Sequence, residues 1–104
     1  MNNKRIYGKF KIKDFFQTSN GLIWLLDFTD ENGEKYSNIK KYSNYKSSEN
    51  GLKYFLKEMN YLNIEFNDYE EITFFTTINQ LLEKTISGFI DSNGIYFDEL
   101  VKGE

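Results

Sequence analysis

The stretch that decides the fold runs from Tyr7 to Thr29 and reads YGKFKIKDFFQTSNGLIWLLDFT. Its first part alternates, so that one face carries Phe10 and Ile12 and the other carries Lys9, Lys11 and Lys13, as expected of a strand with one buried face. Asn20-Gly21 follows, and Asn-Gly between alternating runs is the strongest short-range hairpin signal because both residues tolerate positive φ. The stretch therefore predicts a hairpin.

Two further Asn-Gly pairs, Asn32-Gly33 and Asn93-Gly94, also stand between alternating runs and predict hairpins. The second strand, Leu22 to Thr29, is apolar on both faces at its start, which favours the centre of the sheet. A third strand is expected from about Glu34 to Tyr42. A closing hairpin is expected to join residues 84–91 to residues 95–100.

The middle of the chain has helical periodicity. Ser48 is a candidate N-cap, and apolar residues recur from Leu52 to Leu62 at helical spacing, which predicts a helix from about Glu49 to Leu62. A possible capping box at Asp68 and Glu71 precedes a stretch rich in strand-favouring residues. A second, short helix is expected near residues 78–83, with the preceding turn also helical.

This order predicts a single domain over residues 1–104 with a β-dominated α+β fold. We expect an OB-like five-stranded barrel or curled sheet with a helical insert between strands 3 and 4. The residues expected in the core are Phe10, Ile12, Leu22, Trp24, Leu26, Phe28, Leu52, Phe55, Leu56, Met59, Leu81, Phe89, Ile90 and Ile95.

Composition argues against an enzyme. The chain has no His and no Cys, so the usual general base, thiol nucleophile and zinc ligands are missing. No catalytic residue, metal site or cofactor is therefore expected. The absence of a long apolar run and of a signal peptide predicts a cytoplasmic protein without a membrane segment.

Charge is distributed unevenly along the chain. Residues 1–57 hold eleven Lys/Arg and six Asp/Glu, a net charge of +5, whereas residues 58–104 hold two and ten, a net charge of −8. A protein that is acidic overall can still bind a polyanion if its positive charge gathers on one face. The basic first half is thus a candidate for binding nucleic acid.

Four segments of the chain together carry a resemblance to a known family: residues 8–12 (GKFKI), 30–36 (DENGEKY), 50–56 (NGLKYFL) and 82–88 (LEKTISG). In these segments the chain resembles small bacteriophage single-stranded-DNA-binding proteins of the OB type. The resemblance implies sequence-tolerant binding of single-stranded DNA in phage replication or recombination, without catalysis, in the cytoplasm of the host cell.

Such binding would use lysines to neutralise phosphates and aromatic rings to stack on bases. The candidate nucleic-acid-binding residues are Lys9, Lys11, Lys13, Tyr36, Lys40, Lys41, Tyr42, Tyr45 and Lys46. Trp24 is expected in the core, with a stacking platform as its alternative. The lysines of the first strand could equally protect a sheet edge from aggregation.

A second hypothesis places the function in the acidic half. A phage-encoded inhibitor could bind a host defence protein such as a CRISPR nuclease, presenting negative charge to its nucleic-acid groove. The residues that would do so are Asp68, Glu70, Glu71, Glu83, Asp91, Asp98 and Glu99. The sequence decides neither this protein partner nor the oligomeric state.

Overall fold

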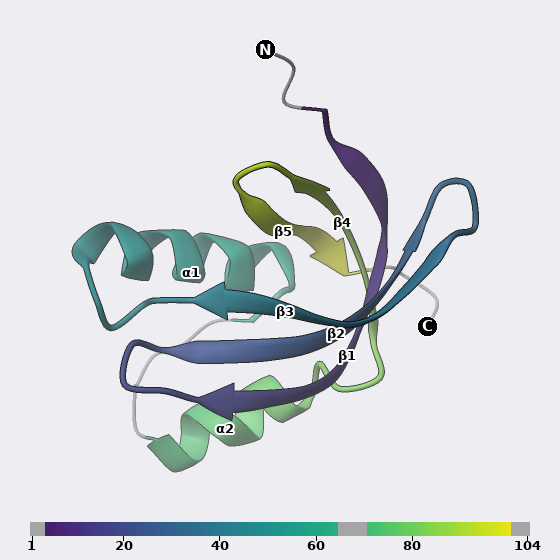
Figure 1. The fold of residues 1–104 in the computed structure, drawn as a ribbon. Helices are drawn as coiled ribbons and strands as arrows, with labels where there is room; N and C mark the ends of the chain where they lie inside the picture. Colours follow the sequence, from purple (N-terminus) through teal and green to yellow (C-terminus); the bar gives the residue numbers. More distant parts are fainter. Residues whose placement is uncertain (1–3, 65–70, 101–104) are drawn as a thin grey trace.

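The computed structural model describes residues 4–64 and 71–100. Its elements, in chain order, are β1 (Ile6–Gln17), β2 (Leu22–Asp30), β3 (Lys35–Ser43), α1 (Glu49–Tyr61), α2 (Glu71–Asn79), β4 (Thr85–Asp91) and β5 (Gly94–Leu100) (Figure 1). The β-dominated fold, with its helical insert between the third and fourth strands, agrees with the prediction. Asp68, one half of the possible capping box, lies outside the described residues.

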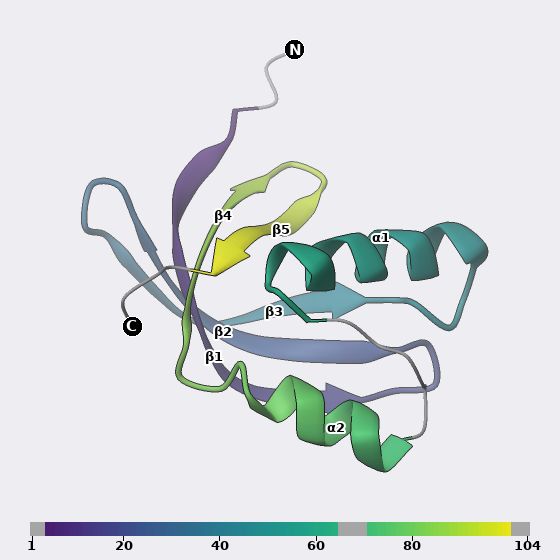
Figure 2. The same ribbon diagram turned by 180° about the vertical axis from the view of Figure 1, so that it is seen from behind.

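The strands form one curled sheet in the order β3-β2-β1-β4-β5, and every neighbouring pair is antiparallel. Because direction reverses at each step, the two edge strands, β3 and β5, run parallel to each other. Figures 1 and 2 show α1 beside β3 and the β4–β5 hairpin, and α2 near the end of β1. The curl of the sheet thus brings its two edges towards the same helix.

The facing predicted for β1 is confirmed. Phe10 and Ile12 are completely buried, whereas Lys9, Lys11 and Lys13 are exposed. The register to β2 shifts between Ile12 and Asp14, so Lys13 is the extra residue of a bulge.

All three hairpins form, but their turns differ from the predicted kind. Among the described residues other than glycine, only Asn38, Asn63 and Glu83 have positive φ, so the asparagines of the three Asn-Gly pairs do not. Instead, a side-chain oxygen two residues before each asparagine accepts from the turn amides. Thr18 Oγ1 accepts from Asn20 and Gly21, Asp30 Oδ1 from Asn32 and Glu34, and Asp91 Oδ1 from Asn93 and Gly94.

Helix α1 begins where predicted. The Ser48 side chain caps it by accepting from the Gly51 amide at 3.0 Å, and the helix buries Phe55, Glu58 and Met59 against the sheet. The second helix, α2, occupies the stretch before residue 78, so the helical turn predicted there is confirmed. The main helix predicted at residues 78–83 is wrong, because α2 ends at Asn79. Phe74 and Ile78, one helical turn apart, are buried in the core, and this burial outweighs the strand propensity of their neighbours.

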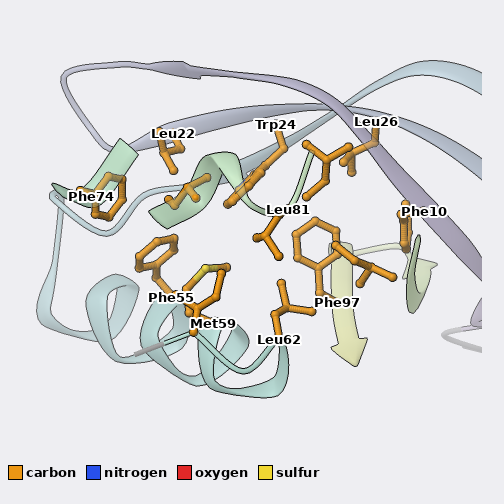
Figure 3. Close-up of a cluster of buried hydrophobic side chains, with 14 of the residues drawn as sticks. Phe10, Leu22, Trp24, Leu26, Phe55, Met59, Leu62, Phe74, Leu81 and Phe97 are labelled. Carbon is orange, nitrogen blue, oxygen red and sulfur yellow. The ribbon is translucent and has the colours of Figure 1, made fainter. Parts of the chain in front are cut away.

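The core is one cluster of side chains between the concave face of the sheet and the two helices (Figure 3). Trp24 belongs to it, with its Nε1 donating to Ser43 Oγ at 2.8 Å, so its core placement is confirmed. Phe89, which was expected in the core, instead lies on the outer face beside Tyr7 and Tyr96. The residues that fill the core from β4 and β5 are Ile86 and Phe97.

A pair of facing glycines explains this difference. Gly8 and Gly88 are opposite each other in the β1–β4 register, on the same side as Phe10 and Ile86. A Cβ at Gly8 would lie 2.8 Å from Cε1 of Phe28, and one at Gly88 would lie 2.8 Å from Cε2 of Phe10. The space above the glycines is therefore taken by rings from neighbouring positions, and the alternation turns Phe89 outwards.

Candidate nucleic-acid interface

The outer face of β1, β2 and β3 is the surface opposite the core. Residues that alternate with the buried ones project from it, and cross-strand register places them in rows. One row joins Lys9, Thr29 and Lys35, and another joins Asp14, Leu25 and Lys40. Lysines on β1 and β3 therefore lie on both sides of β2. The centre of the sheet, which was expected at the second strand, is β1.

An irregularity in β3 brings two of these lysines to one face. Strict alternation would place Lys35 and Lys40 on opposite sides of the strand. The register to β2 shifts between Leu26 and Phe28, and Asn38 adopts a φ of 59° at that point. The bulge restores Lys40 to the side of Lys35, so the outer face gains a positive charge that a regular strand would not give it.

The other end of the same face is aromatic. Phe16, Ile23 and Tyr42 form one cross-strand row. Phe16 is 48% exposed and Tyr42 is 59% exposed, so both rings are largely open to solvent. Exposed apolar side chains that adjoin one another are typical of interaction surfaces, whereas single ones are common on any protein.

Two carboxylates reduce the charge of this outer face. Asp14 and Asp27 share it with five lysines: Lys9, Lys11, Lys13, Lys35 and Lys40. Lys13 Nζ lies 3.7 Å from Asp27 Oδ1 and donates to Asn38 Oδ1 at 3.0 Å. Both members of the ion pair are about two-fifths exposed, so the pair is weak and the excess of positive charge remains.

Lys41, one of the predicted contacts, is not on this surface. Its side chain is buried, and its Nζ lies 3.1 Å from Glu58 Oε1 and donates to the Ile95 carbonyl at 2.6 Å. Burial lowers the pKa of the Lys41 ammonium, which Glu58 partly opposes, and burial raises the pKa of the Glu58 carboxyl, which Lys41 partly opposes. Lys41 is thus removed from the candidate contacts.

The ion pair of Lys41 and Glu58 lies at the seam, by which we mean the place where the edge strands β3 and β5 approach each other. Glu58 Oε2 accepts a hydrogen bond from the Phe97 amide at 3.0 Å, and Lys41 Nζ donates one to the Ile95 carbonyl. These two backbone groups flank Tyr96, and in a parallel ladder one residue of the neighbouring strand would satisfy both. Lys41 and Glu58 therefore bond the two β5 backbone groups that a residue of a parallel neighbouring strand would bond.

The predicted tyrosines fall in three different places. Tyr42 is on the outer face, as described above. Tyr36 is opposite Phe28 in the register and packs on its ring at a centroid distance of 6.0 Å, on the core side of the sheet. Tyr45 is half-buried and stacks on Phe55 at 4.6 Å, so it supports the core, while the neighbouring Lys46 remains exposed. Only Tyr42 combines exposure with the lysine face.

Phe16 is the residue of this surface that the sequence analysis missed. Phe15 and Phe16 are consecutive in a strand, so they must point to opposite faces. Phe15 packs on Trp24 and Phe75, and Phe16 is left outside. Two adjacent phenylalanines in an alternating strand therefore indicate that one of the two rings lies on the outer face.

Four of the seven acidic residues of the second hypothesis have no described side chain. Asp68 and Glu70 lie outside the described residues, as do the side chains of Glu71 and Glu99. Asp91 holds the β4–β5 turn. Within residues 4–64 and 71–100, no group of three potential metal-ligating side chains occurs, and no helix is long and apolar enough to cross a membrane.

Comparison of the chain with protein-family models, with curated protein sequences and with solved structures found no significant match in any of the three.

Proposed function

We propose that the chain binds single-stranded DNA without sequence preference, through the outer face of β1, β2 and β3. The observation that carries the proposal is the row of Phe16, Ile23 and Tyr42, in which both rings are exposed and which is continuous with lysines on both flanking strands. A single strand offers what this surface lacks, namely phosphates for the lysines and base faces for the rings. No chemical step is part of the proposal.

The fold supports this function if the curled sheet is an OB-type barrel. In that architecture, oligonucleotides bind to the face of the second and third strands and to the adjoining loops. The order β3-β2-β1-β4-β5 is the order of such a barrel opened between its third and fifth strands. The proposed surface contains both β2 and β3, and Phe16 and Tyr42 lie beside the β1–β2 turn.

The test is a fluorescence-anisotropy titration of labelled oligo(dT) at two salt concentrations. Two substitutions on the same strand form a matched pair. Tyr42→Ala should lower affinity roughly 5- to 150-fold, because loss of one stacked base costs about 1–3 kcal/mol. Tyr36→Ala removes an exposed tyrosine from the other face and should leave affinity unchanged.

A charge test separates phosphate contacts from stacking. Lys11→Glu combined with Lys40→Glu should weaken binding and make the dependence of log K on log salt shallower by about 0.7 per lost contact. Lys53→Glu combined with Lys57→Glu reverses two exposed lysines of α1, and it is the control for net charge. A folded protein with no oligo(dT) binding at low salt would refute the proposal and would favour an inhibitor that binds a host defence protein.

A further inference from the structure

A groove lies next to the proposed DNA surface, on the other side of β3. Its volume is about 490 Å³, within the range of clefts that hold a nucleotide-sized ligand. Its walls come from three elements that are distant in sequence: β3, α1 and the β4–β5 hairpin. Among the residues that line it are Lys40, Tyr42, Tyr54, Asn93 and Tyr96.

The groove is continuous with the proposed surface. Lys40 and Tyr42 are outer-face residues of β3, and both also line the groove. A strand that contacts Tyr42 thus reaches the groove by crossing one β-strand. This continuity identifies single-stranded DNA, rather than a separate ligand, as the occupant to test.

The chemistry of the groove suits bases better than phosphates. Tyr54 is 49% exposed, and its ring lies 6.0 Å from that of Tyr96, which in turn stacks on Phe89 at 5.0 Å. At the floor, the Lys41 ammonium and the Glu58 carboxylate neutralise each other and are already engaged with backbone groups. The floor therefore offers no free positive charge to a phosphate, whereas the tyrosines offer ring surface.

We propose that a single strand bound on the outer face continues over β3 and places further bases in this groove, against Tyr54 and Tyr96. This inference rests on the proposed function and extends it to a second stacking platform made by α1 and β5. Binding sites on single OB-type domains cover about 4–16 nucleotides, so a two-platform site belongs to the longer part of that range. Because the groove acts by stacking, its contribution is nearly independent of salt.

The experiment measures oligo(dT) affinity against length, from 4 to 16 nucleotides, for three proteins. Wild type should gain affinity in a second step once the oligonucleotide is long enough to reach the groove. Tyr54→Leu should abolish that step, a loss of roughly 5- to 150-fold for long oligonucleotides only, with an unchanged salt slope. Tyr61→Leu is the matched control, since Tyr61 is also on α1, is 42% exposed and does not line the groove.

The outcomes distinguish the two proposals. If long and short oligonucleotides lose affinity equally in Tyr54→Leu, or if Tyr54→Leu matches Tyr61→Leu, the groove is not a platform, although DNA binding by the outer face stands. If wild type binds no oligonucleotide of any length, both proposals fail together. Thermal unfolding of each variant, followed by circular dichroism, shows that the compared proteins are folded.

Discussion

Removing one member of the buried ion pair should destabilise the protein far more than removing both. In Lys41→Met, the Glu58 carboxylate stays buried without its cation, and breaking a buried pair in this way costs about 3–5 kcal/mol. For a domain of this size, each kcal/mol corresponds to roughly 4–8 °C, so the melting temperature should fall by roughly 12–40 °C.

The double variant Lys41→Met with Glu58→Leu tests the role of the pair at the seam. Exchange of a buried pair for apolar side chains is often neutral or stabilising. Here, however, the Ile95 carbonyl and the Phe97 amide lose their partners, and each unsatisfied buried group costs about 1–3 kcal/mol. The two groups together cost about 2–6 kcal/mol, and the favourable exchange of the pair offsets part of this, so we expect a net loss of about 1–3 kcal/mol.

The assay is urea unfolding followed by the fluorescence of Trp24, the only tryptophan, which is buried beside the seam strand β3 and bonded to Ser43. Single and double variants are compared with wild type under the same conditions. A double variant as stable as wild type, or more stable, would show that the side chains do not replace a backbone rung. A single variant that loses less than the double would contradict the buried-charge argument.

Three further predictions follow from the same structure. The stability of wild type relative to the double variant should increase as pH falls from neutral towards 4.5, because Glu58 with a raised pKa binds its proton in the folded state before the unfolded state does. This relative stability should also increase as pH rises towards 10.5, because Lys41, with its lowered pKa, releases its proton first in the folded state. Urea unfolding at a series of pH values checks both effects. A relative stability that falls towards either pH would show that the attraction within the pair outweighs the effect of burial. Phe97→Ala should lower the free energy of unfolding by about 3–5 kcal/mol, and Phe89→Ala should lower it clearly less, because of these two only Phe97 is fully buried. Equal losses in thermal unfolding would contradict the facing assigned to β4 and β5. Asp91→Ala should cost about 0.5–2 kcal/mol by leaving the Asn93 and Gly94 amides without their acceptor, and unchanged urea unfolding would show that the turn does not need this side chain.

The elements that could be predicted from the sequence are those with local signals. The hairpins follow from their Asn-Gly pairs, the facing of β1 follows from its alternation, and the start of α1 follows from Ser48. In each of these cases, the deciding residues are neighbours in the chain. The prediction of the turn type was wrong. The turns are held by hydrogen bonds from their amides to the side chains of Thr18, Asp30 and Asp91, and not by asparagines with positive φ.

The parts that could not be predicted depend on distant residues. In β4, the residues Ile86, Phe89 and Ile90 are all apolar, and only the pairing of Gly88 with Gly8 decides which of them face the core. Lys41 follows the inward alternation of its strand, but its burial requires Glu58 from a helix that the sequence alone does not place beside it. The proposed surface could not be predicted in full either, because the bulge at Asn38 decides which lysines of β3 share a face.

The side-chain turns also have a consequence for the order of folding. Ser48-Glu49-Asn50-Gly51, at the start of α1, repeats the spacing of the three hairpin turns, with an oxygen-bearing side chain three residues before each glycine. Such contacts are local and can form in microseconds, on the timescale of hairpin formation, before any distant part of the chain has arrived. The pairing of β1 with β4 brings together residues near opposite ends of the chain and closes the largest loop. Collision of a preformed β1–β2–β3 meander with a preformed β4–β5 hairpin is therefore the step that we expect to set the folding rate.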